Sequence, residues 1–183
     1  DLTYQQPWTL GSRWRLSGNL FRERREEIGF DVQRAGAVAE IQRELLDRQR
    51  PLRASLQYHL RWVRRFNVDP ALIQEAVEPG GEIIASLRPA LTWDRRNDPL
   101  NPTRGSLHFV SLEGAGFPLG SEVSFLKSEL ATTWLLDVVG PTVLALSARV
   151  GLAGALGATP DLPIEDRFFA GGETTIRGYG RNR

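Results

Sequence analysis

Neither cysteine nor methionine occurs among the 183 residues, and histidine occurs only twice. Without cysteine the chain forms no disulfide framework and no thiolate metal site, which is compatible with an environment outside the cytoplasm. His59 and His108 fall in different segments and lack the spacing of paired metal ligands. Because the chain begins at Asp1 and has no methionine, we expect it to be an excerpt of a longer protein.

An excess of charge of either sign is also missing, since 23 Lys and Arg residues face 22 Asp and Glu residues. No global field therefore favours nucleic acid or an acidic partner. Long apolar runs are absent as well, because the best candidate, residues 135–157, is interrupted by Asp137, Pro141 and Arg149. A membrane-spanning helix needs roughly 18 uninterrupted apolar residues, so the sequence excludes a helical membrane protein.

What the sequence does contain is alternation of apolar and polar residues. In residues 51–62, Leu52, Leu56 and Leu60 share the apolar parity, whereas Arg53 and His59 lie on the polar one. A period of two predicts a strand with one apolar and one polar face. The pattern recurs in residues 12–21, 82–94, 125–137 and 142–153, and less cleanly in 30–45 and 106–117.

Turn signals rich in Gly, Pro, Asp and Asn separate these segments. Together they predict an all-β chain of about seven consecutive antiparallel strands in an up-and-down meander. Residues 30–45 are expected as a strand because regular strands flank them, although a helix from Ala35 to Leu46 is the alternative. Pro89 cannot donate to a ladder and predicts a bulge or a sheet edge.

Two architectures fit this alternation, because the apolar face covers a core in a soluble sandwich and meets lipid in a membrane barrel. Several segments exceed the about 5 to 6 residues of an ordinary strand and match the about 9 to 11 of a membrane-crossing one. Trp14, Trp62, Trp93 and Trp134 lie near segment ends on the apolar parity, as an interfacial girdle requires. The sequence therefore favours the barrel. The face expected to line its lumen is rich in cations, namely Arg13, Arg15, Arg53, Arg61, Arg65, Arg88, Lys127 and Arg149.

Residues that could carry chemistry form no recognisable arrangement. The glycine-rich residues 166–183 lack the Lys-Ser/Thr pair of a phosphate loop, so nucleotide binding is not expected. Asp94, Asp98 and Glu165 show no paired arrangement that would support acid–base catalysis. We therefore expect no enzyme activity, no cofactor and no metal site.

Two stretches resemble motifs of the BamA/TamA superfamily of outer-membrane assembly and translocation proteins. The sequence RFFAGGETTIRGY, residues 167–179, resembles the signature of that family's returning loop, with Arg167, Phe168, Ala170, Gly171, Gly172, Ile176, Arg177, Gly178 and Tyr179 in pattern. Residues 91–109 resemble its periplasmic turn, with Asp94, Asn101, Pro102 and Gly105 in pattern. Residues 2–8 and the stretch after them also resemble an earlier turn of the family.

The resemblance implies that residues 1–183 are part of an outer-membrane β-barrel domain. They would run from the end of the fourth strand of an about sixteen-stranded barrel, through the eleventh, into the returning loop. The other strands and the periplasmic POTRA domains are expected outside these residues. The implied function is to assist the insertion, assembly or translocation of other proteins at the outer membrane of a Gram-negative type bacterium. Expected partners are membrane lipid, client outer-membrane or secreted proteins, and periplasmic or outer-membrane accessory proteins, but not nucleic acid.

For the returning loop, the resemblance pairs Arg177 with an acidic group of the inner wall, on strands expected beyond Arg183. A guanidinium in a partly dry lumen destabilises the fold unless it is paired and hydrogen-bonded. Gly171, Gly172 and Gly178 permit the close backbone approach that docking needs. Two alternatives remain, a passive pore or ligand-gated outer-membrane channel, which the cationic lumen face supports, and a soluble β-sandwich binding module.

Overall fold

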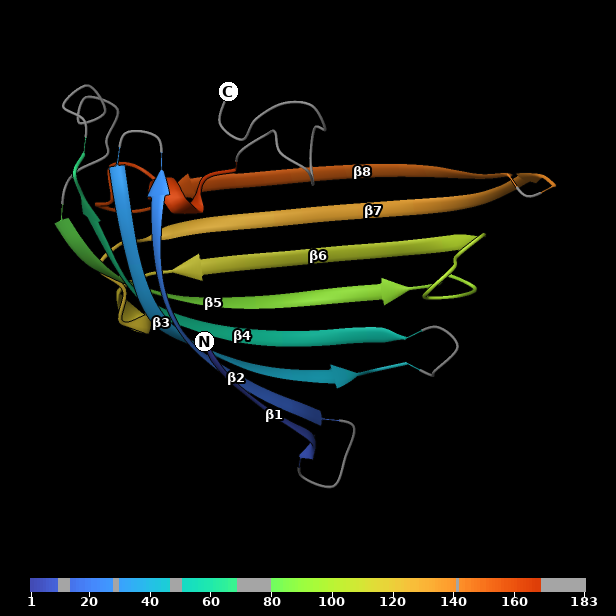
Figure 1. The fold of residues 1–183 in the computed structure, drawn as a ribbon, viewed down its shortest axis with the longest axis horizontal. Coiled ribbons are helices and arrows are strands. Elements are labelled where there is room, and N and C mark those ends of the chain that lie inside the picture. The colour runs from blue at the N-terminus through green and yellow to red at the C-terminus, as the bar shows by residue number, and fades with distance from the viewer. Residues whose placement is uncertain (10–13, 28–29, 47–50, 69–79, 141, 169–183) are drawn as a thin grey trace.

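The computed structural model describes residues 1–9, 14–27, 30–46, 51–68, 80–140 and 142–168. These residues contain eight β-strands in one sheet, in the sequential order β1 to β8, with every neighbouring pair antiparallel (Figure 1). The strands are β1 Leu2–Thr9, β2 Trp14–Glu27, β3 Phe30–Glu44, β4 Leu52–Phe66, β5 Gly80–Asp94, β6 Gly105–Ala115, β7 Phe125–Val139 and β8 Thr142–Ala155. Two single-turn 3₁₀ helices lie between or after strands, η1 Phe117–Leu119 and η2 Ile164–Asp166. No helix of the described part of the chain is long and apolar enough to cross a membrane.

The predicted meander is confirmed, with one strand more than the alternation predicted. Residues 2–8, expected by resemblance in a turn, belong to β1, which pairs with β2 from Leu2 opposite Leu20 to Thr9 opposite Trp14. The pairing is irregular between Pro7 and Thr9. β1 is an edge of the described sheet, where a proline is tolerated because no second neighbour needs its missing N–H. In the described residues β1 and β8 do not pair with each other, so the sheet is open.

β3 is a strand, as expected, and the alternative helix from Ala35 to Leu46 does not form. It pairs with β2 and β4 along almost its whole length. Partners on both sides therefore override the helix preference of its alanines, which illustrates how strongly strand formation depends on context.

Pro89 produces neither the bulge nor the sheet edge expected for it. It lies inside β5, where the ladder to β6 pairs Leu87 with Gly114 and resumes with Ala90 opposite Ser111. The register is the same on both sides of the gap. The missing N–H thus interrupts the pairing locally, and the flanking pairs keep the strands aligned.

Directly paired residues in antiparallel strands share a face, so the register assigns every strand residue to one side of the sheet. We call the face that carries Arg61, Ile84 and Phe125 the inner face, and the opposite one the outer face. An apolar face that stays open to its surroundings is expected of a barrel wall that meets lipid, and not of a sandwich core. The outer face carries these exposed apolar side chains: Leu16, Leu20, Leu56, Leu60, Trp62, Ile83, Leu91, Trp93, Val110, Leu112, Leu126, Leu130, Trp134, Leu136, Leu144, Leu146, Val150 and Leu152.

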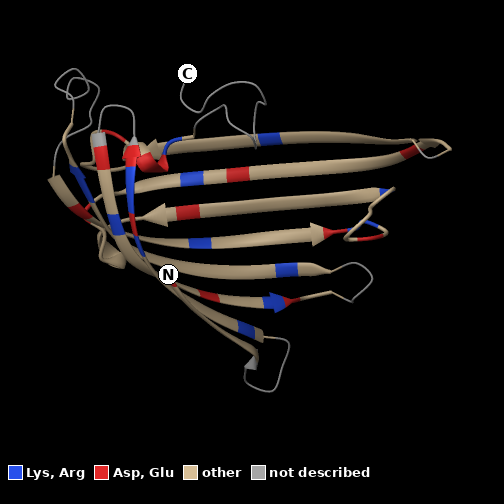
Figure 2. Ribbon diagram, in the orientation of Figure 1, with Lys and Arg blue, Asp and Glu red and all other residues tan. Residues whose placement is uncertain are grey.

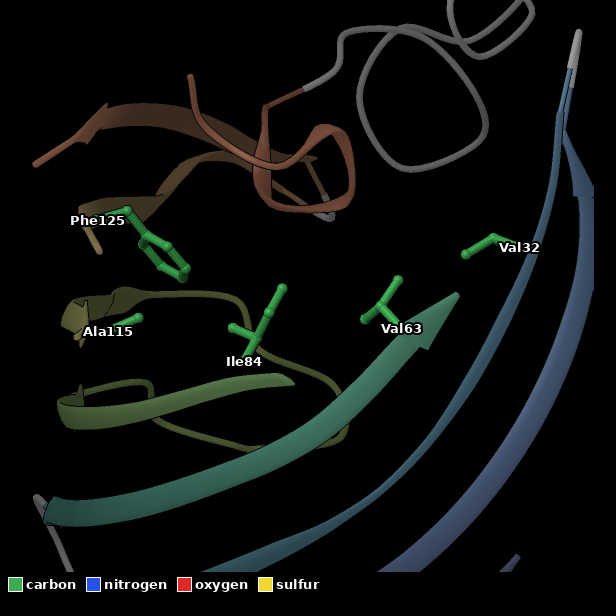
Figure 3. Packing of buried hydrophobic residues seen from close by; sticks show 5 residues of the cluster. All are labelled: Val32, Val63, Ile84, Ala115 and Phe125. Carbon is green, nitrogen blue, oxygen red and sulfur yellow. The ribbon is translucent and has the colours of Figure 1, made fainter. Parts of the chain in front are cut away.

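The buried apolar cluster lies on the inner face, at the end of the sheet where β4 and β6 finish and β5 and β7 begin. Its members converge from five strands (Figure 3) and are Val32, Val63, Ile84, Ala115 and Phe125. Leu162 and Ile164, from the segment that follows β8, pack against it. The cluster therefore provides an apolar surface on the inner wall against which this segment packs.

Candidate functional site

The segment of residues 156–168 crosses the inner face after β8 ends. Its first part is tied to the connection between β6 and β7, because Leu156 N donates to Ser124 O at 2.8 Å and Ser124 N donates to Thr159 Oγ1 at 2.8 Å. Its second part forms η2, whose Asp166 N donates to Pro163 O at 2.9 Å. This single turn presents two consecutive acidic side chains, Glu165 and Asp166, to the wall.

Glu165 is bound by a fork of two hydrogen bonds from β4. Arg65 Nε donates to Glu165 Oε1 at 2.8 Å, and Arg65 Nη2 donates to Glu165 Oε2 at 2.7 Å. The Glu165 side chain is 3% exposed and that of Arg65 is 11% exposed. Arg65 Nη2 also donates to Glu82 on β5, so one guanidinium joins the segment to two strands. A planar guanidinium suits this bidentate geometry, and an ammonium does not.

Asp166 has its own arginine on the same strand. Arg61 Nη2 donates to Asp166 Oδ2, and the carboxylate is almost fully buried. Arg61 and Arg65 lie on the inner face of β4 with Val63 of the apolar cluster between them. We call Arg61, Arg65, Glu165 and Asp166 the ionic dock. Here the segment supplies the acids and the wall supplies the arginines, the reverse of the polarity expected for Arg177.

The two carboxyl groups of η2, which lie outside the strands, respond differently to burial. Burial alone would raise the pKa of Glu165, but the hydrogen bonds and charge of Arg65 outweigh it and hold this pKa below its ordinary value. For Asp166, burial is the larger effect and raises the pKa, despite the opposing attraction of Arg61. The ionic dock therefore combines one strongly ionised carboxylate with one that burial destabilises in its charged form.

Phe168 continues the contact along the wall to β7 and β8. A Cβ atom added at Gly151 of β8 would lie 2.6 Å from Phe168 Cζ, so the ring rests directly on the glycine. Lys127 Nζ of β7 lies 4.6 Å from the centroid of the same ring, a cation–π distance. Gly151 thus leaves the space that the Phe168 ring occupies.

Of the loop motif, only Arg167 and Phe168 fall within the described residues. Arg167 Nε donates to Leu162 O at 3.0 Å and so closes the turn of its own segment. Gly171, Gly172, Ile176, Arg177, Gly178 and Tyr179 lie outside the described residues. The structure therefore places the first two residues of the motif and leaves the roles of the others as predictions.

The strands carry both basic and acidic residues (Figure 2), and those on the inner face make this wall mixed in charge rather than simply cationic. Glu129 lies 3.5 Å from Arg88 and 3.7 Å from Arg149, between their two strands. Ser86 Oγ donates to the buried Glu113 at 2.7 Å. The inward direction of the predicted cations agrees with the register, except that Arg13 lies outside the described residues. Acidic neighbours offset much of their charge.

A polar hollow of about 220 Å³ opens on the same face, nearer the end of the sheet that carries the turn of residues 95–104. Its lining includes Arg53, Arg88, Glu40 and Gln57. Gln57 Nε2 donates to Glu40 Oε1 at 3.1 Å, so these side chains are ordered by one another. The inner wall thus changes from a polar surface to an apolar cluster towards the ionic dock.

The turn of residues 95–104 lies at the opposite end of the strands from the ionic dock. Asp94 accepts from Arg96 Nε at 2.9 Å and from Arg96 Nη2 at 2.7 Å, which fixes the exit from β5. Gly105 has φ +111°, and a Cβ atom there would lie 2.2 Å from Arg95 O. Only glycine fits this position. Two of the four expected turn residues therefore have defined roles.

The other two expected turn residues contribute less than their neighbours do. Asn101 donates its backbone N–H to Asp98 Oδ1 at 3.2 Å, and Pro102 has no polar side chain. Asn97 lies within the stretch that resembles the periplasmic turn but was not among its singled-out residues, and it accepts from the N–H groups of Thr103 and Arg104 at 3.1 Å each. Asn and Asp side chains commonly bond to nearby backbone in this way, which is the signal that could have identified Asn97.

The ionic dock is the main feature that sequence reasoning missed. Arg61 and Arg65 were expected on the lumen face, and Glu165 was considered only as an isolated carboxylate. Nothing in the alternation pairs residues that lie 100 positions apart, as Arg65 and Glu165 do. The sequence does hold a usable signal. Two adjacent acids, Glu165 and Asp166, come directly before the loop motif, and the two arginines of residues 61 and 65 share the inward-facing parity of one strand.

Comparisons with known proteins agree with this architecture. The family model described as "Omp85 superfamily domain" matches residues 1–183. The chain is 35% identical over 102 residues to the Sorting and assembly machinery component 50 homolog of Bos taurus. This alignment covers 56% of this chain and 21% of that protein. It is also 35% identical over 89 residues to the Outer membrane protein assembly factor BamA of Neisseria meningitidis serogroup B. That alignment covers 48% of this chain and 11% of the relative.

A solved structure is similar over nearly the whole chain. BamA from Haemophilus ducreyi, lacking POTRA domains 1–3, matches with a TM-score of 0.78 at 16% identity, covering 98% of this chain and 37% of its own. At that identity the match shows the fold, a section of an antiparallel barrel. The resemblance to the BamA/TamA type is confirmed. Since the family model matches residues 1–183 throughout, the chain belongs to the Omp85 superfamily.

Proposed function

We propose that this chain is the central part of an outer-membrane β-barrel that assists the insertion and assembly, or the translocation, of other proteins. The observation that carries the proposal is the ionic dock, which fastens a segment across the inner face of a sheet whose outer face is apolar. A segment fastened inside a barrel wall braces the wall and occupies the lumen. The names of the relatives, a sorting and assembly component and an assembly factor, support the same activity.

We place the protein in the outer membrane of a Gram-negative type bacterium, with lipid, client proteins and accessory proteins as partners. The relative from Neisseria meningitidis and the solved structure from Haemophilus ducreyi support a bacterial setting, although similar proteins also occur in animals and a fission yeast. Fractionation of the native cell tests this location. Recovery in the inner membrane or the soluble fraction would contradict it.

We further propose that the tip of the returning loop, residues 176–179, docks inside the lumen. Arg177 would pair with an acidic group of the wall, and Gly171, Gly172 and Gly178 would allow the backbone to approach it closely. Ile176 and Tyr179 would flank the arginine at this tip, and the turn of Asp94, Asn101, Pro102 and Gly105 would face the periplasm. The protein would act without catalytic chemistry, through binding and positioning alone.

The decisive experiment measures client folding by the full-length protein in lipid vesicles. An unfolded client barrel protein is added, and its folding is followed by the heat-sensitive shift of its band on a gel. Arg65→Ala and Arg177→Ala are expected to slow client folding several-fold while the protein itself stays inserted. Arg177→Lys should restore activity only in part, because an ammonium cannot form two parallel bonds to a carboxylate. Full activity in both alanine variants would contradict the proposal.

The alternatives give different results in the same vesicles. A passive pore would conduct ions in a planar bilayer and would leave client folding at the rate of empty vesicles. A soluble binding module would remain folded and monodisperse without detergent, which the exposed apolar outer face makes unfavourable. We favour the assembly barrel because the ionic dock and the apolar cluster cover the inner face at one end of the sheet, which an open pore would leave clear.

A further inference from the structure

The outer face changes from apolar to cationic at a defined level of β2, β3 and β4. One outward-facing row across the three strands contains Leu20, Ala37 and Leu60. The next outward-facing row towards the end with the ionic dock contains Arg22, Ala35 and Trp62. The row after that on the same face contains Arg24, Gln33 and Arg64. Three outward-facing arginines therefore border the apolar band. We call Arg22, Arg24 and Arg64 the arginine border.

The apolar band has the height of a bilayer core. Leu52 and Trp62 delimit it on β4, ten positions apart along the strand. Ten residues span roughly 33 Å at about 3.3 Å per residue. With a strand tilt of roughly 40°, this corresponds to a band about 25 Å tall, as in outer-membrane barrels. Arg64, the next outward residue after Trp62, thus falls at the level of lipid headgroups.

Two of these arginines have no counterion among the described residues. Arg22 and Arg64 are exposed, and neither makes a hydrogen bond or an ion pair with any residue that the structure describes. Arg24 lies 3.4 Å from Asp31 Oδ2, with its guanidinium carbon 5.1 Å from the Phe66 ring centroid. The inner-face arginines of the ionic dock behave differently, because each is matched by a carboxylate. The outer face leaves room for an external anion.

The outward-facing acidic residues of these strands lie beyond the arginine border, so the border separates them from the apolar band. Glu26, Asp31 and Phe66 form the following row on the outer face. Asp31 is held there, since it accepts from Asn67 Nδ2 at 2.9 Å. Along the strands the order is therefore apolar, then basic, then acidic. An anion anchored in lipid meets the arginines before it meets the acids.

We propose that the arginine border binds the phosphate group of an anionic membrane lipid. The inference rests on the membrane placement proposed above. Guanidinium groups suit phosphate because they donate several hydrogen bonds in one plane. The ring of Trp62, 39% exposed beside Arg64, provides the amphipathic surface that interfacial lipid contacts use. With the turn of residues 95–104 on the periplasmic side, the arginine border contacts the outer leaflet.

The test compares lipid retention by the full-length protein and two matched variants. Each protein is inserted into mixed vesicles of phosphatidylcholine and phosphatidylglycerol, extracted gently, and analysed by native mass spectrometry for bound lipid. The outer-face variant is Arg22→Gln with Arg64→Gln. The control is Arg15→Gln with Arg53→Gln, which removes the same charge from the inner face of the same two strands. Arg64→Gln alone is included in case the double variant folds poorly.

The unmodified protein and the control should retain phosphatidylglycerol in preference to phosphatidylcholine. Each outer-face arginine removed should lower that preference roughly fivefold, because a basic residue at an anionic surface contributes about 1 kcal/mol. Equal retention in all variants would overturn the proposal. So would displacement of the lipid by inorganic phosphate at the same concentration, since that outcome identifies a site for small anions. Failure of every protein to insert would instead contradict the membrane placement and, with it, this inference.

Discussion

Arg65 on β4 and Glu165 in η2 lie 100 positions apart in the chain and are joined by two parallel hydrogen bonds of 2.8 and 2.7 Å. Removal of one partner leaves the other as an unpaired charge with little access to water. Such a loss costs about 3 to 5 kcal/mol when the pair is buried. The bond therefore decides whether residues 156–168 stay on the inner wall.

Arg65→Ala and Glu165→Gln are each expected to expose residues 156–168 to protease in the full-length, membrane-inserted protein. Arg65→Lys should protect the segment only partly, because it keeps the charge and loses the fork. The double variant should lose less than the sum of the two single variants, since the pair acts as a unit. Arg15→Gln, on the same face without a described partner, is the control. Strictly additive losses would show that the two residues are not coupled.

The docking of η2 should depend on pH in opposite ways for its two carboxyl groups. The pKa of Glu165 is held below its ordinary value of 4.5, so its contribution is complete above that pH and is lost as the pH falls. Burial raises the pKa of Asp166 above its ordinary value of 3.8. The docked state therefore becomes more stable as the pH falls and Asp166 takes up a proton. The opposing slopes partly cancel in the unmodified protein.

Single substitutions should separate these slopes. With Asp166→Asn, protease protection of residues 156–168 should weaken as the pH falls below about 4.5, because the released Glu165 then takes up a proton that the Arg65-bound carboxylate resists. With Glu165→Gln, protection should instead rise as the pH falls towards the ordinary pKa of Asp166. Around Asp166 the charged groups are Arg61, Glu113 and Lys127, and around Glu165 they are Arg65 and Arg34. Parallel slopes in the two variants would disprove the assignment.

Gly151→Ala should displace the Phe168 ring without unfolding the strands. The added Cβ atom would lie 2.6 Å from Phe168 Cζ, closer than carbon atoms approach, and the partly exposed ring is the group that can move. We expect faster protease cleavage near residue 168, with a change of at most about 1 kcal/mol in the stability of the barrel. Gly154→Ala is the matched control on β8, because no atom lies within 4 Å of its added Cβ. Equal effects from both substitutions would mean that Phe168 does not rest on Gly151.

The strands could be predicted from the sequence because their signal is local. Leu52, Leu56 and Leu60 reveal a strand by their spacing alone, and the register adds only which neighbour each one meets. The two errors have local causes as well. β1 was hidden by the short alternation before Pro7, and Pro89 was overvalued because two-sided pairing of the flanking residues keeps β5 in register.

The ionic dock could not be predicted because its signal is long-range. Alternation places Arg61 and Arg65 on the lumen face, but no spacing rule connects them with the two acids of η2. The roles of Gly105 and Asn97 required backbone geometry, since a φ of +111° and a pair of N–H groups facing one amide oxygen are not visible in residue types. The motif resemblance marked the turn and residues 167–179, but it included none of the four residues of the ionic dock.

Gly105→Ala should destabilise the turn between β5 and β6. The φ of +111° is unfavourable for alanine, and its Cβ atom would lie 2.2 Å from Arg95 O, a backbone atom that cannot move alone. The expected cost is about 1 to 3 kcal/mol, measured by urea unfolding from lipid vesicles. Gly114→Ala on β6 is the control, because the nearest atom to its added Cβ is Leu126 Cδ1 at 3.9 Å. An equal cost for both would show that the turn adapts to a side chain at residue 105.

Leu130→Lys tests the assignment of the outer face to lipid. Leu130 lies near the middle of β7, is 51% exposed, and is flanked on the same face by Val110 and Val150. A lysine at the bilayer midplane of such a barrel costs about 2 to 4 kcal/mol. Thr133→Lys, three positions along the same strand on the inner face, should cost far less, because its ammonium group enters a polar environment beside Ser147. Unfolding from vesicles measures both free energies. A larger cost at residue 133 than at residue 130 would reverse the two faces of the sheet, and with them the direction in which the ionic dock and the arginine border point.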